Sequence, residues 1–215
     1  MPASAADAPC PEQAFNATAL KWHTCAWLLL PVLVFLAGWM HWYAALPLTL
    51  LTAAGLAPRK CKEPQTRDSL PAFPLFTRSS FLALAAFAAL MALSGWGEWV
   101  NQHPDHIVRN ACLRELVASP WPVIFPDGNV LIYNTGFWLV PALAGKLAGL
   151  DAARVLVVLW GTWGLFLSWL WLCVFSGRRS LLLALLLAAF GSLLNFQCWL
   201  GLDLFRLHYF GTAEQ

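Results

Sequence analysis

Residues Val155–Ser176 read VLVVLWGTWGLFLSWLWLCVFS, an apolar run without a charged side chain. A helix that crosses the hydrocarbon core of a bilayer needs roughly 20 such residues, with about 17 as the practical minimum. The run therefore predicts a transmembrane helix and indicates a membrane protein.

The rest of the sequence agrees with this class. Of the 215 residues, 60% are hydrophobic and 11% are charged, and the mean hydropathy is +0.62. A chain of this size cannot enclose a core large enough to bury that much apolar surface. Four more uncharged runs occupy residues 26–40, 44–57, 81–97 and 181–202. We therefore expect an all-α fold, a polytopic transmembrane helical bundle of about five spans.

The first two runs are separated by His41, Trp42 and Tyr43. Trp and Tyr prefer the headgroup layer, so these residues predict the turn of a tight transmembrane hairpin over residues 23–57. One long kinked helix is the alternative. The first apolar run begins too late and has no convincing small-residue cleavage site near its end, so residues 1–22 are interpreted as a retained cytoplasmic tail, not a cleaved signal peptide.

Positive charge predicts the orientation of the chain. Residues 58–79 form a basic loop, which the positive-inside rule places in the cytoplasm. Its basic residues are Arg59, Lys60, Lys62, Arg67 and Arg78. A hairpin returns to the side on which it began, so the N-terminus is also expected inside. Residues 81–97 then lead outward.

Residues 131–150 allow two interpretations. If they span the membrane, Arg178 and Arg179 lie outside, against the charge rule. If they lie in the outer interface, the run 155–176 crosses inward and both arginines stay in the cytoplasm. Pro141 and Gly145 also suit a bent interfacial segment. We prefer the interfacial interpretation, in which residues 98–153 form one outer loop and residues 206–215 end on the outer side.

The outer loop concentrates the ionisable residues of the chain. Its first eighteen positions hold Glu98, His103, Asp105, His106, Arg109, Arg114 and Glu115. Pro104 predicts a helix start, and residues 105–117 have helical composition. Helical spacing puts Asp105 and Arg109 on one face, and likewise His106 and Asn110. We expect an amphipathic helix that lies on the membrane and presents these four residues together. An acidic residue at a helix start is commonly only a cap, and a catalytic carboxylate is the alternative.

The loop gives weak indications of a metal. His103, Asp105 and His106 offer two or three ligands, and nothing completes the set. The six cysteines contain no C-x-x-C and suit neither zinc nor a disulfide framework. We expect no cofactor, with a divalent cation as the minor alternative. The net charge of +2 gives no indication of a nucleic-acid partner.

A longer pattern runs through this region. Asp105 and Arg109 precede a proline-bearing stretch, which leads to Tyr133, Trp138 and the run Lys146–Gly149. Asp151-Ala-Ala-Arg154 and the run ending at Gly177-Arg178-Arg179 follow. This order resembles the N-terminal half of GT-C superfamily glycosyltransferases, such as protein O-mannosyltransferases and the aminoarabinose transferase of lipid A. It is also similar to bacterial polytopic membrane proteins of GT-C-like organisation, and it covers roughly residues 80–205.

The resemblance implies a function at the outer face of the bacterial cytoplasmic (inner) membrane. It implies transfer of a sugar from a polyprenyl-phosphate donor to an acceptor hydroxyl. Asp105 would then be the base for that hydroxyl, and Arg109 the partner of the lipid phosphate or of a carboxylate. The residues expected to bind substrate are His106, Asn110, Lys146, Asp203 and Arg206.

The chain departs from the family pattern in two respects. Many relatives carry two adjacent acids where this chain has Asp105-His106, and such enzymes are much longer. We therefore expect an N-terminal portion of a longer enzyme. The alternatives are a non-catalytic membrane protein that keeps the scaffold and, third, a small transporter, which the uncharged spans disfavour.

Overall fold

The computed structural model describes residues 14–15, 17–56, 73–74, 77–100, 102 and 104–189. These residues form α1 (Ala17–Trp39), α2 (Trp42–Leu56), α3 (Arg78–Leu93), α4 (Pro104–Ala118), α5 (Gly136–Ala148) and α6 (Leu150–Ser176). Residues 181–189 are also helical. Two-residue strands, β1 (Ala14–Phe15) and β2 (Phe73–Pro74), pair antiparallel. The prediction of an all-helical fold is confirmed, while the predicted site residues His103, Asp203 and Arg206 lie outside the described residues.

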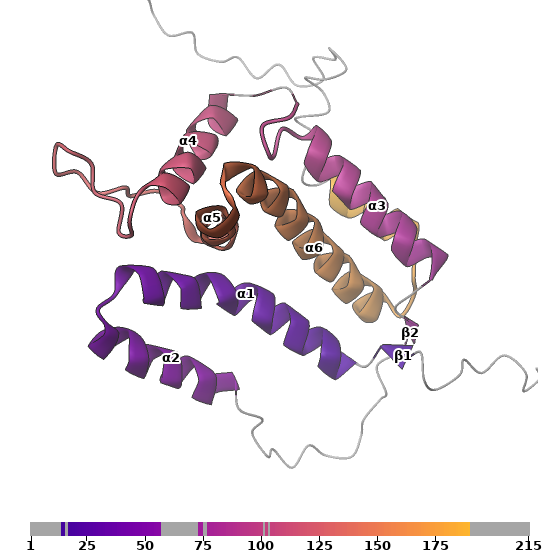
Figure 1. The fold of residues 1–215 in the computed structure, drawn as a ribbon. Coiled ribbons are helices and arrows are strands. Elements are labelled where there is room, and N and C mark those ends of the chain that lie inside the picture. Colours follow the sequence, from indigo (N-terminus) through magenta and orange to yellow (C-terminus); the bar gives the residue numbers. More distant parts are fainter. Residues whose placement is uncertain are drawn as a thin grey trace, which may run out of the picture.

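Helix α6 lies at the centre of the described fold. It contacts α1, α3, α4 and α5, and Figure 1 shows it between α1 and α3, with α5 at its N-terminal end. Only Gly149 separates α5 from α6, and its φ of +90° is a conformation that favours glycine. The sharp change of direction between the two helices therefore depends on this residue.

Two apolar clusters surround α6 along its length. One joins the first turn of α1 to α3 and the C-terminal half of α6, and includes Phe87, Phe166 and Trp169. The other joins α1, α4, α5 and the N-terminal half of α6, and includes Leu116, Leu139 and Val157. Because each cluster takes residues from helices far apart in the sequence, α6 acts as the common support.

The first two apolar runs form separate helices. Helix α1 ends at Trp39 and α2 begins at Trp42, with the backbone N–H groups of Ala44 and Ala45 bonded to the carbonyl of His41. The chain therefore makes the tight turn expected at this position and does not continue as one kinked helix. Helix α2 packs on α1 and buries none of its residues.

Two described helices are long and apolar enough to cross a membrane, at residues Ala19–Trp39 and Leu150–Ser176. Helices α2, α3 and α5 have 15, 16 and 13 residues. At 1.5 Å per residue they are roughly 20–24 Å long, shorter than a hydrocarbon core of about 30 Å. The five-span arrangement stays a prediction.

Long-range hydrogen bonds define one end of the bundle, here called the β1 end. Arg179 follows α6, and its Nη1 donates to Thr77 Oγ1 at 2.6 Å and Ser80 Oγ at 2.9 Å, where α3 begins. In the last turns of α6, Trp171 Nε1 donates to Thr24 Oγ1 of α1 at 2.9 Å. The C-terminal end of α6 therefore lies beside the starts of α1 and α3.

Trp121 organises the opposite end, here called the α4 end. Its ring lies 5.0 Å from that of Trp39 at the end of α1, and its Nε1 donates to the carbonyl of Leu116 in α4 at 2.8 Å. A Cβ at Gly38 would lie 2.6 Å from the Trp121 ring. The glycine therefore gives the space in which the loop after α4 meets α1.

The close crossing of three helices at Gly145 gives a stability prediction. A Cβ at Gly145 of α5 would lie 2.5 Å from Val117 Cγ2 of α4 and 2.8 Å from Ala153 Cβ of α6. We expect Gly145→Ala to lower the free energy of unfolding by about 1–3 kcal/mol through overpacking. This cost exceeds the gain of about 1 kcal/mol that Ala brings in helix propensity.

The matched control is Gly136→Ala in the same helix, where a Cβ would meet nothing within 4 Å. Thermal unfolding of both purified variants measures the difference. Equal unfolding temperatures for the two variants would contradict the close crossing.

Candidate functional site

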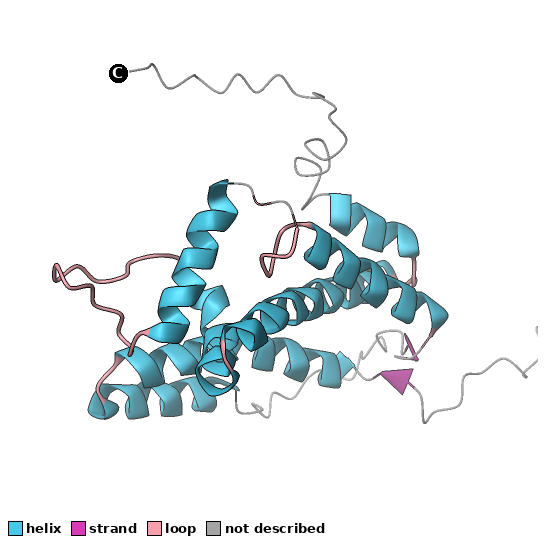
Figure 2. Cartoon of the chain, turned by 45° about the horizontal axis from the view of Figure 1, so that its top comes forward, coloured by secondary structure: helices cyan, strands magenta, loops and turns pink. Residues whose placement is uncertain are grey.

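Helix α4 carries the predicted catalytic residues at the α4 end. It begins at Pro104, as the sequence predicts, and packs on α5 and α6. Figure 2 shows it standing steeply across the direction of α6, at the end of the bundle remote from β1 and β2. One face of α4 is thereby buried, and the other is left exposed.

Asp105 and Arg109 lie one helical turn apart on α4. Asp105 is exposed in the first turn, where the helix dipole favours a carboxylate. Arg109 is half-buried, and its guanidinium carbon lies 5.7 Å from the centre of the Trp96 ring. This cation–π contact holds the Arg109 side chain near the surface of α4 on which Asp105 is exposed.

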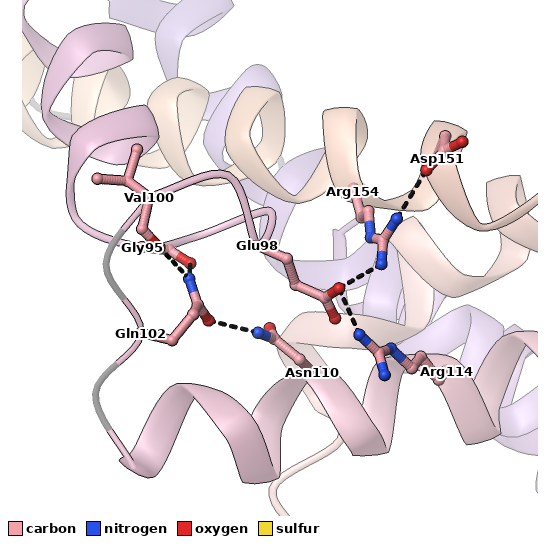
Figure 3. Close-up of polar contacts among 8 residues, drawn as sticks. All are labelled: Gly95, Glu98, Val100, Gln102, Asn110, Arg114, Asp151 and Arg154. Carbon is pink, nitrogen blue, oxygen red and sulfur yellow. Dashed lines mark hydrogen bonds and ion pairs between the residues drawn. The ribbon is translucent and has the colours of Figure 1, made fainter.

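His106 and Asn110 lie on the buried side of α4. His106 meets the Trp96 ring edge-on, with 6.0 Å between ring centres. Asn110 Nδ2 donates to Gln102 Oε1 at 2.6 Å, and Gln102 Nε2 donates to the carbonyls of Gly95 and Val100 (Figure 3). These contacts hold the loop after α3 against α4. Substrate binding by His106 and Asn110 stays a prediction.

Lys146 lies on the other side of α4, at its C-terminal end. From α5, its Nζ donates to the backbone carbonyls of Ser119 and, at 3.5 Å, Val117. The same ammonium lies 5.0 Å from the centre of the Trp121 ring. A cation beside the last carbonyls of a helix is stabilising, so Lys146 has a structural role here. Its predicted role in substrate binding stays a prediction.

A second group of charges, here called the Glu98 cluster, consists of Glu98, Arg114, Asp151 and Arg154. The sequence analysis did not predict that these residues pair with one another. Arg114 Nη2 of α4 lies 2.6 Å from Glu98 Oε2, and Arg154 of α6 bonds the same oxygen through its Nη2 (Figure 3). Arg154 Nη1 also lies 2.8 Å from Asp151 Oδ1. The Glu98 side chain is only 11% exposed, whereas Asp151 is exposed.

The backbone at Glu98 adopts an unusual conformation that points its side chain into the cluster. Its φ is +68°, the only positive value at a non-glycine residue in the part of the chain described. Gly95 and Gly97, with φ of +91° and +86°, form the same turn. A left-handed residue with a Cβ costs roughly 1–2 kcal/mol, and the two arginine contacts oppose that cost.

The pKa of the Glu98 carboxyl reflects competing causes. Burial raises this pKa, but the hydrogen bonds and positive charges of Arg114 and Arg154 together outweigh burial, and the pKa lies below its usual value. The carboxylate is therefore ionised and paired at neutral pH. A general base works best with a pKa near the operating pH, so the cluster suits positioning better than proton transfer.

Among the described residues, no group of three or more His, Cys, Asp or Glu side chains could hold a metal ion. Comparison of the chain with protein-family models, curated proteins and solved structures finds no match. The candidate site therefore stands on its geometry and on the motif order alone. It consists of Asp105 and Arg109 on the exposed side of α4, held in place by Trp96 and the Glu98 cluster.

The lowered pKa gives a pH prediction. A depressed pKa contributes stability above the ordinary value of 4.5, and this stability is lost as the pH falls through the folded-state pKa below it. We expect Glu98→Gln to lower the free energy of unfolding at neutral pH by about 1.5–3 kcal/mol, since it removes hydrogen bonds to a charged group.

Chemical denaturation across this pH range is the measurement. The difference between wild type and Glu98→Gln should shrink as the pH falls below 4.5. Glu115→Gln, outside the cluster, is the control and should change stability little. A difference that stays constant with pH would contradict the ionised pairing of Glu98.

Proposed function

We propose that this chain is an integral membrane protein of GT-C-like organisation that transfers a sugar from a polyprenyl-phosphate donor to an acceptor on the outer face of the bacterial cytoplasmic membrane. The observation that carries the proposal is the position of Asp105 and Arg109 together on α4, at the end of the bundle remote from Lys21, Arg78 and Arg178. The motif order from Asp105 to Arg154 supplies the reaction class.

The exposed apolar surface of α1 and α2 supports the proposal that the bundle lies in lipid. Only 17% of the apolar window of α1 is buried, and α2 buries no residue. Large exposed apolar side chains on these two helices include Leu28, Val32, Phe35, Leu46, Leu50 and Leu51. Such a continuous apolar surface is costly in water and favourable in hydrocarbon.

The distribution of charge supports the orientation. Lys21, Arg78 and Arg178 are exposed near the β1 end, where α1 and α3 start and α6 stops. Arg114 and Lys146 are exposed at the α4 end, so the bias comes from the basic residues that the sequence places in the segment 58–79 leading into α3. The positive-inside rule assigns the β1 end to the cytoplasm and the α4 end to the outer face. In this orientation α5, at 13 residues, lies in the outer interface.

The proposed chemistry needs a base and a cation near each other. Asp105 removes the proton from the acceptor hydroxyl as that hydroxyl attacks the anomeric carbon of the sugar. The bond between that carbon and the lipid phosphate breaks, and Arg109 stabilises the departing phosphate through charge-assisted hydrogen bonds. The i, i+4 spacing on α4 holds the two groups on one surface.

A non-catalytic protein on the same scaffold is the second candidate, and one observation favours it. His106 stands where many relatives carry a second acid, and it is 6% exposed against Trp96. A buried aromatic contact cannot replace a solvent-facing carboxylate. If this candidate is correct, the conformation of α4 is retained for binding and no transfer occurs.

The orientation can be tested by labelling single introduced cysteines in intact bacterial cells with an impermeant thiol reagent. Cysteines at Asn129 and Asp151 should react, because both positions are exposed and assigned to the outer side. A cysteine at Arg178 should react only after permeabilisation. The chain with its native cysteines gives the background, and protection of Asp151 with labelling of Arg178 would mean that residues 131–150 span the membrane.

The reaction can be tested in membranes that contain each variant and a polyprenyl-phosphate sugar. Asp105→Asn should reduce turnover by roughly 10²–10⁴-fold, the usual contribution of a general base, while expression and insertion persist. Asp127→Asn is the matched control and should have little effect. Asp127 lies in the exposed turn of the loop after α4, between the paired residues Ile124 and Val130. Near-normal transfer by Asp105→Asn would remove this residue from the mechanism.

A further inference from the structure

A partly open cavity of about 330 Å³ lies between the helices of the bundle, beside the loop that follows α3. Residues of α1, α3, α5 and α6 line it together with the helical segment 181–189. Its volume falls within the range of roughly 300–1,000 Å³ that is usual for small-molecule sites. The cavity is separate from the exposed carboxylate of Asp105, which does not line it.

Glycines on α6 let large apolar side chains pack closely beside the cavity. Gly161 and Gly164 line the cavity, and a Cβ at either position would collide with a neighbouring side chain, Met91 of α3 or Trp27 of α1. Phe137 of α5 adds a further apolar wall. The cavity wall is therefore largely apolar.

The polar groups of the cavity wall are satisfied within the protein. Ser94 Oγ donates to the carbonyl of Met91 at 3.0 Å, and Ser168 Oγ donates to the carbonyl of Gly164 at 2.9 Å. Trp27 Nε1 donates to the carbonyl of Trp160 at 3.2 Å. A cavity of this kind offers water few partners and is suited to a hydrocarbon occupant.

Trp96 links the cavity wall to a positive charge that lies outside it. Gly161 and Ser168 are seven residues apart on α6, which corresponds to roughly 10 Å along the helix axis. Trp96 lines the cavity where the chain leaves α3, and Arg109 lies over the Trp96 ring. A chain in the cavity with its headgroup toward Trp96 would bring an anion within reach of that guanidinium.

We propose that the cavity binds one hydrocarbon chain of an anionic membrane lipid, with Arg109 attracting the headgroup. The inference rests on the membrane placement proposed above and shares Arg109 with the proposed reaction, but retention of a lipid chain in the cavity does not require sugar transfer. The apolar wall of the cavity and the surrounding apolar helices indicate a hydrocarbon chain as the occupant. The charge of Arg109 beside Trp96 indicates an anionic headgroup.

The test uses the full chain purified in detergent and stripped of lipid. Dioleoyl-phosphatidylglycerol is added, bound lipid is counted by native mass spectrometry, and the unfolding temperature is followed by tryptophan fluorescence. The wild type should retain one lipid and unfold several degrees higher in its presence, because a ligand that binds only the folded state stabilises it. Ser168→Phe and, independently, Ala188→Phe place a ring in the cavity and should abolish both effects.

Leu172→Phe, one turn further along α6 and outside the cavity wall, is the matched control and should bind lipid as the wild type does. Arg109→Gln should still retain lipid, but its affinity for phosphatidylglycerol should fall about tenfold and become similar to its affinity for phosphatidylcholine. Glycerol phosphate alone should not stabilise the protein. Undiminished lipid retention by both cavity-filling variants, or equal stabilisation by glycerol phosphate, would overturn the proposal.

The outcome is independent of the transfer assay. Specific lipid binding by a protein that transfers no sugar would leave this inference standing and would overturn only the proposed reaction. If Ser168→Phe and Ala188→Phe both transfer sugar and retain lipid like the wild type, the lipid-binding inference is overturned and the proposed reaction stands.

Discussion

The crossing of α4, α5 and α6 at Gly145 is the contact on which the rest of the structure depends. Val117 and Ala153 approach this glycine so closely that no larger residue fits without a shift. Such close packing leaves no free space into which the helices can shift, so it fixes their separation. This crossing fixes α4, and with it Asp105, to the central helix.

The Glu98 cluster adds a directional constraint to that packing. Apolar contacts hold α4 near α6 but specify its rotation poorly, whereas ion pairs require particular atoms to meet. Glu98 bonds Arg114 of α4 and Arg154 of α6 with a single carboxylate oxygen. The strained conformation of Glu98 persists because surrounding contacts over-determine it, as is common near functional sites.

The predicted site residues on α4 lie on two different faces of the helix. On α4, Asp105 is exposed, while His106 and Asn110 are used to hold the loop of Gly95 and Gln102. The expectation that α4 presents all four residues together is therefore wrong for His106 and Asn110, which are buried, because spacing alone does not show which face packs inward. That choice follows from Trp96 and Gln102, whose positions depend on how the chain turns after α3.

The sequence by itself determined the helical class, the start of α4 at Pro104 and the shared face of Asp105 and Arg109, and it favoured the turn between α1 and α2 over one kinked helix. These features depend on local composition and on a period of 3.6 residues, which neighbouring residues are enough to specify. Only the tertiary structure decided the pairing of Glu98 with Arg154, the capping of α4 by Lys146 and the cavity beside Gly161 and Gly164. Each of these joins residues from elements far apart in the sequence, and such contacts are set by the packing of whole helices, which no local pattern encodes.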